Sequence, residues 1–391
     1  MTNQRESVPP EQPAAKKKKK SLGRRLIILL LVLCAVLGAA ALTSMEDGSH
    51  FASLRRWLMY GDSGGAKDIY VYAADPANRY GKLGAGLLVV NSNTAQLISD
   101  EGSMVYDLPI RMSSPQLSVG ARQAAICDVG GGALYILDQS GVRRTMQTEE
   151  GLCYFSANLN GSDYLAVTEQ KTGYKTFVSV YDPDGNLIFT FDSYNNYLGD
   201  AKVTEDGRSV VIVRLESQGG IFASGLLVYD LASGELKSSA SILDGLVMDY
   251  CCNGDRVIAL CDNRFAITGL DGEKFLDQSY GNLYLHDYAL TGRDFSALLL
   301  GRYQAGNICT LTTYDLEGEK IASLELTDEV LDISAGGDYL AVLYGEELVV
   351  YRRDLTEYAR LEDTDYAGQV LVEKSGGILL ISGSSAWRFL P

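Results

Sequence analysis

A hairpin pattern recurs along most of this chain. The segments "VYDPDGNLIFTF" at 180–191, "VYDLASGELKSS" at 228–239 and "TYDLEGEKIASL" at 313–324 each have the pattern of a strand, a turn and a second strand. A repeat of about 40 residues is typical of a four-stranded propeller blade, so this spacing predicts an all-β propeller. The residues that precede the turns occur at intervals of 36 to 48 and are Ile98, Leu137, Tyr181, Tyr229, Thr268, Tyr314, Tyr351 and Trp387.

A second motif alternates with the first, namely a glycine turn followed by an apolar strand. It occurs as "GAGLLVV" from 84, "NGSDYLAV" from 160 and "GGDYLAVLY" from 336, and once in each of the other repeats. Asn-Gly, Asp-Gly and Gly-Gly supply the positive φ angles that tight turns between strands require. Two hairpins per repeat indicate four strands per repeat. Apolar runs such as "VVIV" and "LLLG" are expected inside a blade, covered on both faces by neighbouring blades.

The two ends of the repeat region predict how the ring closes. The last repeat has its third strand around Trp387 but no fourth strand, whereas "DIYVYAA" at 68–74 precedes the first glycine turn without a partner. Pairing this segment with the last repeat completes eight blades and removes an open sheet edge, which would promote aggregation. Seven blades is the alternative, if residues 78–108 do not form a full blade.

The N-terminal region predicts a membrane anchor. Residues 26–42, "LIILLLVLCAVLGAAAL", are 17 residues without a charge or a proline, which is just long enough for a helix to cross the bilayer. Positive charges before a span favour a cytoplasmic N-terminus. The charges that set this orientation are Lys16, Lys17, Lys18, Lys19, Lys20, Arg24 and Arg25.

The predicted organisation therefore has four parts. Residues 1–25 are a disordered basic cytoplasmic tail, 26–42 a single transmembrane helix, 43–67 a juxtamembrane linker, and 68–391 an extracytoplasmic propeller. The alternative is a cleaved signal peptide, because 38–41 supply the small residues that a signal peptidase accepts, and the propeller would then be secreted.

Charge excludes one class of partner. Residues 1–25 carry a net charge of +6, whereas the rest carries −22 of the total of −16. A body this acidic repels phosphate backbones, so we expect no nucleic-acid binding. The expected partners are the membrane, through one helix, and an extracytoplasmic protein, peptide or glycan.

Residues with catalytic or metal-binding chemistry are scarce. The histidines are His50 and His286, and the neighbour Asp287 should point to the opposite face of its strand. The alternating oxygens of "DPDGN" at 182–186 resemble part of a calcium loop, but a hairpin turn explains Pro183 and Gly185 without a metal. We therefore predict no catalytic residue, no cofactor and no metal site, and we expect reduced thiols in the buried strands.

The repeats carry a family resemblance. "VYDLASGELKSS" is similar to quinoprotein-like and WD40-like propeller repeats, in which a strand ending in Asp precedes a small-residue turn, a Gly and a further strand. The basic head, single anchor and repeats over 68–391 resemble a family of unknown function, made up of membrane-anchored propellers from Gram-positive bacteria. The resemblance implies a fold and a location, and no active site. Two departures from better-known relatives are that Trp57 and Trp387 are the only tryptophans and that "LVLC" at 31–34 lacks a lipoprotein signal.

Two hypotheses on function follow. The first is a non-enzymatic binding or assembly scaffold for a protein, peptide or cell-wall ligand, and the second is a carboxylate-based hydrolase or lyase acting in the propeller funnel. Facing carboxylates with raised pKa values in the funnel would favour the enzyme, whereas a lining of small and apolar residues would favour the scaffold. A glycine-bearing insertion is the candidate contact loop, formed by Gln218, Gly219, Gly220, Ile221 and Phe222.

Overall fold

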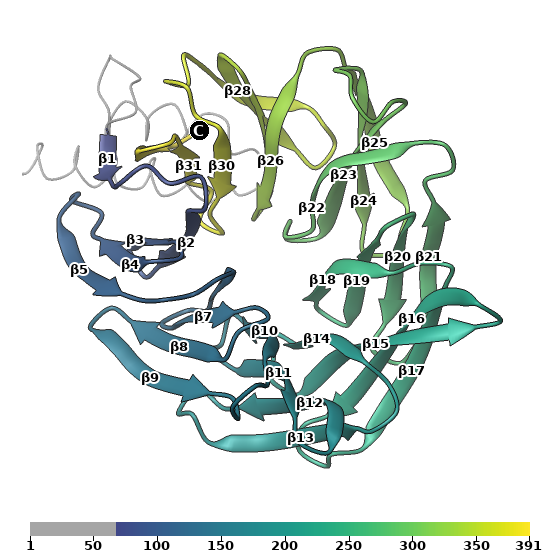
Figure 1. Ribbon diagram of the computed structural model, residues 1–391. Helices are drawn as coiled ribbons and strands as arrows, with labels where there is room; N and C mark the ends of the chain where they lie inside the picture. The colour runs from purple at the N-terminus through teal and green to yellow at the C-terminus, as the bar shows by residue number, and fades with distance from the viewer. Residues whose placement is uncertain (1–67) are drawn as a thin grey trace, which may run out of the picture. The chain divides into compact units, whose positions relative to one another are not determined.

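The strands of the protein form a closed ring of eight antiparallel sheets, each with four strands (Figure 1). The structure is a computed structural model and describes residues 68–391. The prediction of an all-β propeller with eight blades is confirmed, and the seven-blade alternative is wrong because 79–109 form a complete blade. The predicted tail, membrane helix and linker at 1–67 lie outside the described residues. Within 68–391, no helix has the length and apolar character needed to span a membrane.

Each blade from the first to the seventh uses four consecutive strands, with the first strand nearest the ring axis. Blades 1 to 4 are β2 (Arg79–Leu83), β3 (Gly86–Val90), β4 (Thr94–Ile98), β5 (Met104–Pro109); β6 (Pro115–Val119), β7 (Ala124–Asp128), β8 (Ala133–Asp138), β9 (Gly141–Gln147); β10 (Tyr154–Leu159), β11 (Leu165–Lys171), β12 (Tyr174–Tyr181), β13 (Leu187–Ser193); and β14 (Leu198–Val203), β15 (Ser209–Gln218), β16 (Ile221–Asp230), β17 (Leu236–Leu243). Blades 5 to 8 are β18 (Val247–Asn253), β19 (Arg256–Cys261), β20 (Arg264–Gly269), β21 (Lys274–Ser279); β22 (Tyr284–Ala289), β23 (Phe295–Gly301), β24 (Cys309–Asp315), β25 (Lys320–Leu326); β26 (Val330–Gly336), β27 (Tyr339–Tyr344), β28 (Glu347–Arg352), β29 (Glu357–Glu362); and β30 (Gln369–Val372), β31 (Ile378–Ile381), β32 (Ser385–Phe389), β1 (Asp68–Val71).

Burial follows the position of a strand within its blade. The runs "VVIV" and "LLLG" lie in β15 and β23, the second strands of their blades, and their apolar side chains are largely buried because neighbouring blades cover both faces. Fourth strands such as β17 lie at the rim and mix exposed with half-buried residues. First strands such as β6 and β18 are less completely buried than second strands, because one of their faces borders the axis.

The residues that precede the repeated turns mark an irregularity in the sheets. At seven of the eight, from Ile98 to Tyr351, the ladder between the third and fourth strands shifts register. Such a bulge bends and twists a strand locally. The repeated motif is therefore structural, because it shapes the outer edge of each blade.

The eighth blade closes the ring with the first strand of the chain. Strand β1 pairs with β32, with Tyr70 opposite Ala386 and Val71 opposite Ser385, which confirms the predicted closure. The strand ends at Val71, however, and 72–74 continue as loop. Tyr70 and Tyr72 are buried in a cluster that joins blade 8 to blade 1.

The ring has two distinct faces. The ends of the first strands meet around one mouth of the axis, so the turns after the first and third strands, which carry both repeated motifs, share this side; we call it the motif face. The turns after the second strands and the connections between blades lie on the other side, which we call the loop face. Alternate antiparallel strands in every blade impose this division.

Candidate functional site

A cavity of about 870 Å³ occupies the axis of the ring at the motif face, and all eight blades contribute to its wall. Much of the wall is small or apolar, including Gly81, Leu117, Val203 and Gly336. The first strands approach one another closely here. A Cβ atom on Gly336 would lie 2.5 Å from the carbonyl oxygen of Val372 in the next blade, so only glycine fits.

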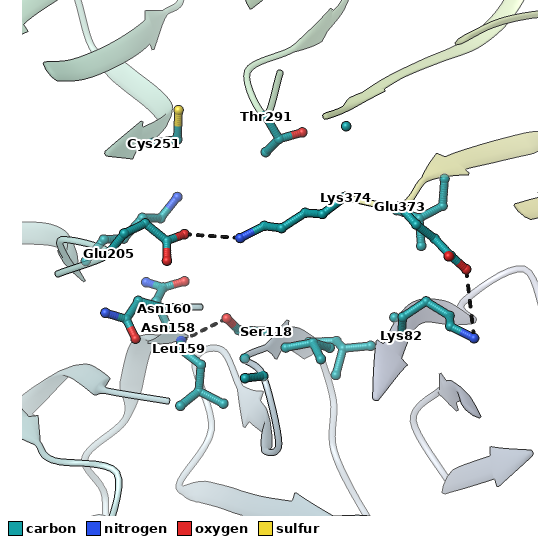
Figure 2. A pocket seen from close by; sticks show the side chains of 18 of the residues that line it. Lys82, Ser118, Asn158, Leu159, Asn160, Glu205, Cys251, Thr291, Glu373 and Lys374 are labelled. Atoms are coloured by element: carbon teal, nitrogen blue, oxygen red, sulfur yellow. Dashed lines mark hydrogen bonds and ion pairs between the residues drawn. The ribbon is translucent and has the colours of Figure 1, made fainter. Parts of the chain in front are cut away.

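Most polar side chains in the wall are engaged in bonds between neighbouring blades. Ser118 Oγ accepts a hydrogen bond from the Leu159 amide at 2.9 Å, as Figure 2 shows. Asn160 Nδ2 donates to the carbonyl oxygen of Thr204 at 2.7 Å, and Thr291 Oγ1 donates to that of Ala335 at 2.7 Å. These groups hold the ring together, which leaves fewer of them available to bind a ligand.

One ion pair spans the cavity mouth. Lys374 Nζ of blade 8 lies 3.5 Å from Glu205 Oε1 of blade 4, on the opposite side of the ring (Figure 2). The two side chains are 84% and 52% exposed, so water screens the pair and its contribution to stability is small. A second pair, Lys82 with Glu373 at 3.9 Å, lies against the wall, where burial lowers the pKa of Lys82.

Four first strands carry an aspartate at the same place, which the sequence analysis did not identify. Each lies where the ladder to the second strand shifts register. A signal existed, since an apolar residue, any residue and an Asp occur at or next to the start of each of these strands, as "LGD", "VMD", "LHD" and "VLD". The aspartates are Asp200 in β14, Asp249 in β18, Asp287 in β22 and Asp332 in β26.

These carboxylates hold adjacent blades together. Asp287 Oδ2 accepts from the Ile333 amide at 2.9 Å, and Asp332 Oδ2 accepts from the Val370 amide at 2.7 Å. Burial raises the pKa of Asp287, and that of Asp332 to about 6.

The other two aspartates border a lysine. Asp249 Oδ1 accepts from Lys202 Nζ at 2.8 Å, while Asp200 lies 4.0 Å from the same ammonium. Burial raises the pKa of Asp200. Burial lowers the pKa of Lys202, but the charges of Asp249 and Asp200 outweigh this effect and raise the pKa above its usual value.

Facing carboxylates with raised pKa values in the funnel would favour an enzyme, and a small, apolar lining would favour a scaffold. Carboxylates with raised pKa values are present, but Asp200, Asp287 and Asp332 do not line the axial cavity, and each accepts hydrogen bonds from the ring itself. Glu205 and Glu373 do line the cavity, and each already has a cationic partner. The small and apolar wall matches the expectation for a scaffold.

A structural role for Asp332 predicts a specific pH dependence. Because the folded state holds the proton more tightly than the unfolded state, Asp332 costs stability as pH rises from about 4 to about 6, and Asn avoids that cost. Asp332→Asn keeps an oxygen for the Val370 amide, so we expect the variant to melt above the wild type at pH 7.5, with a much smaller difference at pH 4.5. Scanning calorimetry at both values measures this. Asp328→Asn, at an exposed carboxylate nearby, is the control, and an equal difference at both pH values would contradict the assignment.

Exposed large apolar side chains gather on the loop face. Twelve of them follow one another around the ring from the end of blade 3 to the start of blade 7: Tyr194, Tyr197, Leu215, Ile221, Phe222, Leu243, Met248, Leu283, Tyr284, Tyr303, Ile308 and Leu331. We call this set the apolar arc. Exposed apolar groups on the motif face, such as Leu187 and Leu236, instead lie at the start of fourth strands on the outer rim. Large apolar side chains exposed together on one face are typical of interaction sites.

The predicted contact loop belongs to the apolar arc. It is a two-residue turn, with Gly219 and Gly220 at φ angles of 60° and 84°, between the ten-residue strands β15 and β16. The hairpin stands out from the ring in Figure 1. Ile221 and Phe222 are 54% and 65% exposed. Gln218 pairs with Ile221 across the turn.

The other residues considered from sequence have structural surroundings. His286 Nε2 lies 2.8 Å from the carbonyl oxygen of Tyr303, and Asp287 has different partners, as its place on the strand predicts. Asp182 Oδ1 accepts from the Asp184 and Asn186 amides, which is the hairpin-turn geometry. Trp387 is buried in the core between blades 7 and 8.

Thiols and potential metal ligands are the remaining reactive groups. The six cysteines from Cys127 to Cys309 are free thiols in the structure; Cys127, Cys261 and Cys309 are buried, and the other three are half-buried. In β18, Cys252 lies opposite Val257, because Gly254 and Asp255 form the turn. The part of the chain from 68 onward contains no group of three or more His, Cys, Asp or Glu side chains that could hold a metal.

These features define a closed eight-bladed β-propeller with a tightly bonded axis and an apolar loop face. The chain belongs to a family of unknown function, DUF5711, whose model matches residues 68–364. By sequence, no curated protein matches the chain.

Solved structures share the fold at low sequence identity. The C-terminal WD40 domain of Sif2 has a TM-score of 0.57 at 12% identity, covering 83% of this chain and 98% of that one. BamB from Moraxella catarrhalis has a TM-score of 0.54 at 12% identity, covering 83% and 100%. The quinohemoprotein alcohol dehydrogenase ADHIIG from Pseudomonas putida has a TM-score of 0.55 at 6% identity, covering 83% and 76%. Because an enzyme shares this fold, function has to be argued from the surfaces of this chain.

Proposed function

We propose that this protein is a membrane-anchored, extracytoplasmic propeller that acts as a non-enzymatic binding or assembly scaffold for a protein, peptide or cell-wall ligand. The observation that carries the proposal is the apolar arc, which leaves side chains as large as Phe222 and Tyr303 65% and 73% exposed on one face. Leaving such groups in water forgoes about 1.5–3 kcal/mol each, which burial against a partner recovers. The basic tail and apolar run at 16–42 support anchoring with the propeller outside.

The axis of the ring supports the same proposal. A ligand-processing site needs polar groups that are free to meet a substrate, whereas Ser118, Asn160 and Thr291 are bonded to neighbouring blades. The ring thus resembles a rigid platform whose variable connections lie on the loop face. Binding residues are commonly found on loops that a rigid scaffold positions.

Photo-crosslinking in intact cells tests both the binding face and the location. A photoreactive amino acid replaces Tyr303, in the loop-face turn of blade 6, or Glu317, in the motif-face turn of the same blade. We expect a discrete crosslinked product from position 303 and none from 317. Protease added outside protoplasts after irradiation should digest that product.

Two results would contradict the proposal. No crosslinked product from either position, or a product only from position 317, would argue against a binding role for the loop face. A crosslinked product that resists external protease until the membrane is lysed would place the propeller in the cytoplasm.

A further inference from the structure

A hollow of about 400 Å³ interrupts the apolar arc between blades 5 and 6. Met248 at the start of β18 and Leu283 and Tyr284 at the start of β22 line it, and they are 65%, 39% and 48% exposed. The volume lies within the range of protein ligand pockets, about 300–1,000 Å³. The hollow is thus large enough to receive side chains of a partner.

The wall of the hollow is held by bonds within the ring. His286 Nε2, 2.8 Å from the carbonyl oxygen of Tyr303, ties the loop between β23 and β24 to β22. Asp262 Oδ1 accepts from the Leu246 amide at 2.9 Å, which fixes the turn after β19. A site held in shape in this way loses less conformational entropy on binding.

Negative charge lies on one side of the hollow. Asp262 lies in the wall, and Asp244 lies near it in the connection from blade 4 to blade 5; both are exposed, and we call these two carboxylates the acidic rim. Two arginines lie near the hollow: Arg264 is paired with Asp277 at 2.9 Å, and Arg302 is exposed in the loop between β23 and β24. Apolar side chains beside exposed carboxylates are complementary to a surface that is apolar at its centre and basic at its edge.

We propose that this hollow binds a protein segment that places a bulky apolar side chain beside lysine or arginine. The inference rests on the proposed scaffold function and names the chemistry of its partner. The apolar side chain occupies the space between Met248 and Tyr284, and the cation meets Asp262. The acidic rim disfavours an anionic lipid surface, which would be repelled by the same carboxylates.

Peptide binding to the full chain in nanodiscs of zwitterionic lipid tests the proposal. Three fluorescent ten-residue probes are compared by anisotropy: one with Leu, Phe and Lys, one with Glu in place of Lys, and one with Ser in place of Leu and Phe. We expect the first to bind, and the other two to bind at least about tenfold more weakly, since each loses one kind of contact. Binding of the first probe should weaken as the salt concentration rises.

Variants locate the site. Met248→Ser combined with Tyr284→Ser should weaken binding of the first probe about tenfold. Asp262→Asn keeps an acceptor for the Leu246 amide, and it should reduce both the affinity for the first probe and the salt dependence of that affinity. Leu236→Ser, at a 50% exposed residue on the motif face, is the matched control and should leave binding unchanged.

The results separate this inference from the scaffold proposal. The inference is wrong if the first probe does not bind, binds no better than the acidic probe, or binds the hollow variants as tightly as the wild type. This holds even if the photoreactive residue at position 303 still crosslinks a partner. Binding to vesicles rich in anionic lipid that the hollow variants abolish would replace the peptide partner by a membrane surface. A crosslinking failure at 303 with intact peptide selectivity would instead count against the cellular role alone.

Discussion

A chain that starts at Asn78, and so lacks β1, should lose most of its stability and aggregate, whereas a chain that starts at Gly61 should stay soluble and melt as the full protein does. Strand β1 is the fourth strand of blade 8, and its loss exposes the edge of β32 along the ladder that it forms with Tyr70 and Val71. Unpaired edges of this kind promote association between chains. The loss also removes Tyr70 and Tyr72, 1% and 6% exposed, from the junction of blades 8 and 1.

The size of the effect follows from those two side chains. Removing a buried aromatic residue costs about 3–5 kcal/mol, so the pair accounts for roughly 6 kcal/mol or more, against a total stability of about 5–15 kcal/mol. Tyr72 Oη also donates to the carbonyl oxygens of Ser382 and Ser385, at 2.9 and 2.8 Å. Those contacts are lost as well.

Light scattering and thermal denaturation by circular dichroism measure the outcome. Point variants of the full chain separate closure from chain length: Tyr70→Ala with Tyr72→Ala should lower the melting temperature strongly, while Val71→Ala, at a 68% exposed position of the same strand, should not. Equal melting temperatures for chains starting at 61 and 78 would refute the closure.

The closure was predictable from sequence because it depends on counting. A repeat that ends after its third strand at Trp387 requires a fourth strand, and 68–74 was the segment without a partner. Hydrophobic alternation and turn residues are local signals, and eight copies of each reinforce one another. The same counting resolves the number of blades, since the weak first repeat forms the complete sheet from β2 to β5.

The candidate sites were predictable only in part. Ile221 and Phe222 were singled out as a contact loop, but the sequence could not show that Met248, Tyr284 and Tyr303, from three other segments, lie on the same face. That grouping depends on the direction of every strand in the ring. The aspartates of the first strands were missed for a related reason, because a single Asp in a strand has no partner in the local sequence and Asp332 meets Val370 only in the next blade.

Asp163→Ala should be among the most destabilising point changes on the motif face. The Asp163 side chain is 1% exposed and joins blade 3 to blade 2. Its Oδ1 accepts from the Arg122 amide at 2.9 Å and from the Gln123 amide at 3.2 Å, and its Oδ2 accepts from Arg122 Nε at 3.1 Å. Alanine would leave both amides without these bonds, at about 1–3 kcal/mol for each buried group. The backbone of Asp163 also has a φ of 64°, which Asp and Asn tolerate better than Ala does.

Together these terms predict a loss of about 3–5 kcal/mol for Asp163→Ala, or roughly 5–10 °C in melting temperature for a domain of this size. Asp163→Asn keeps one oxygen for the two amides and tolerates the positive φ, so it should lose less than half as much. Arg122→Gln is the matched control, because the Arg122 side chain is 74% exposed and its ion pair contributes little. Calorimetry at pH 7 measures the melting temperatures of the three variants and so ranks their stabilities. If Asp163→Ala melted within a degree or so of Arg122→Gln, the bonds from Asp163 to the backbone of blade 2 would not be what secures this junction.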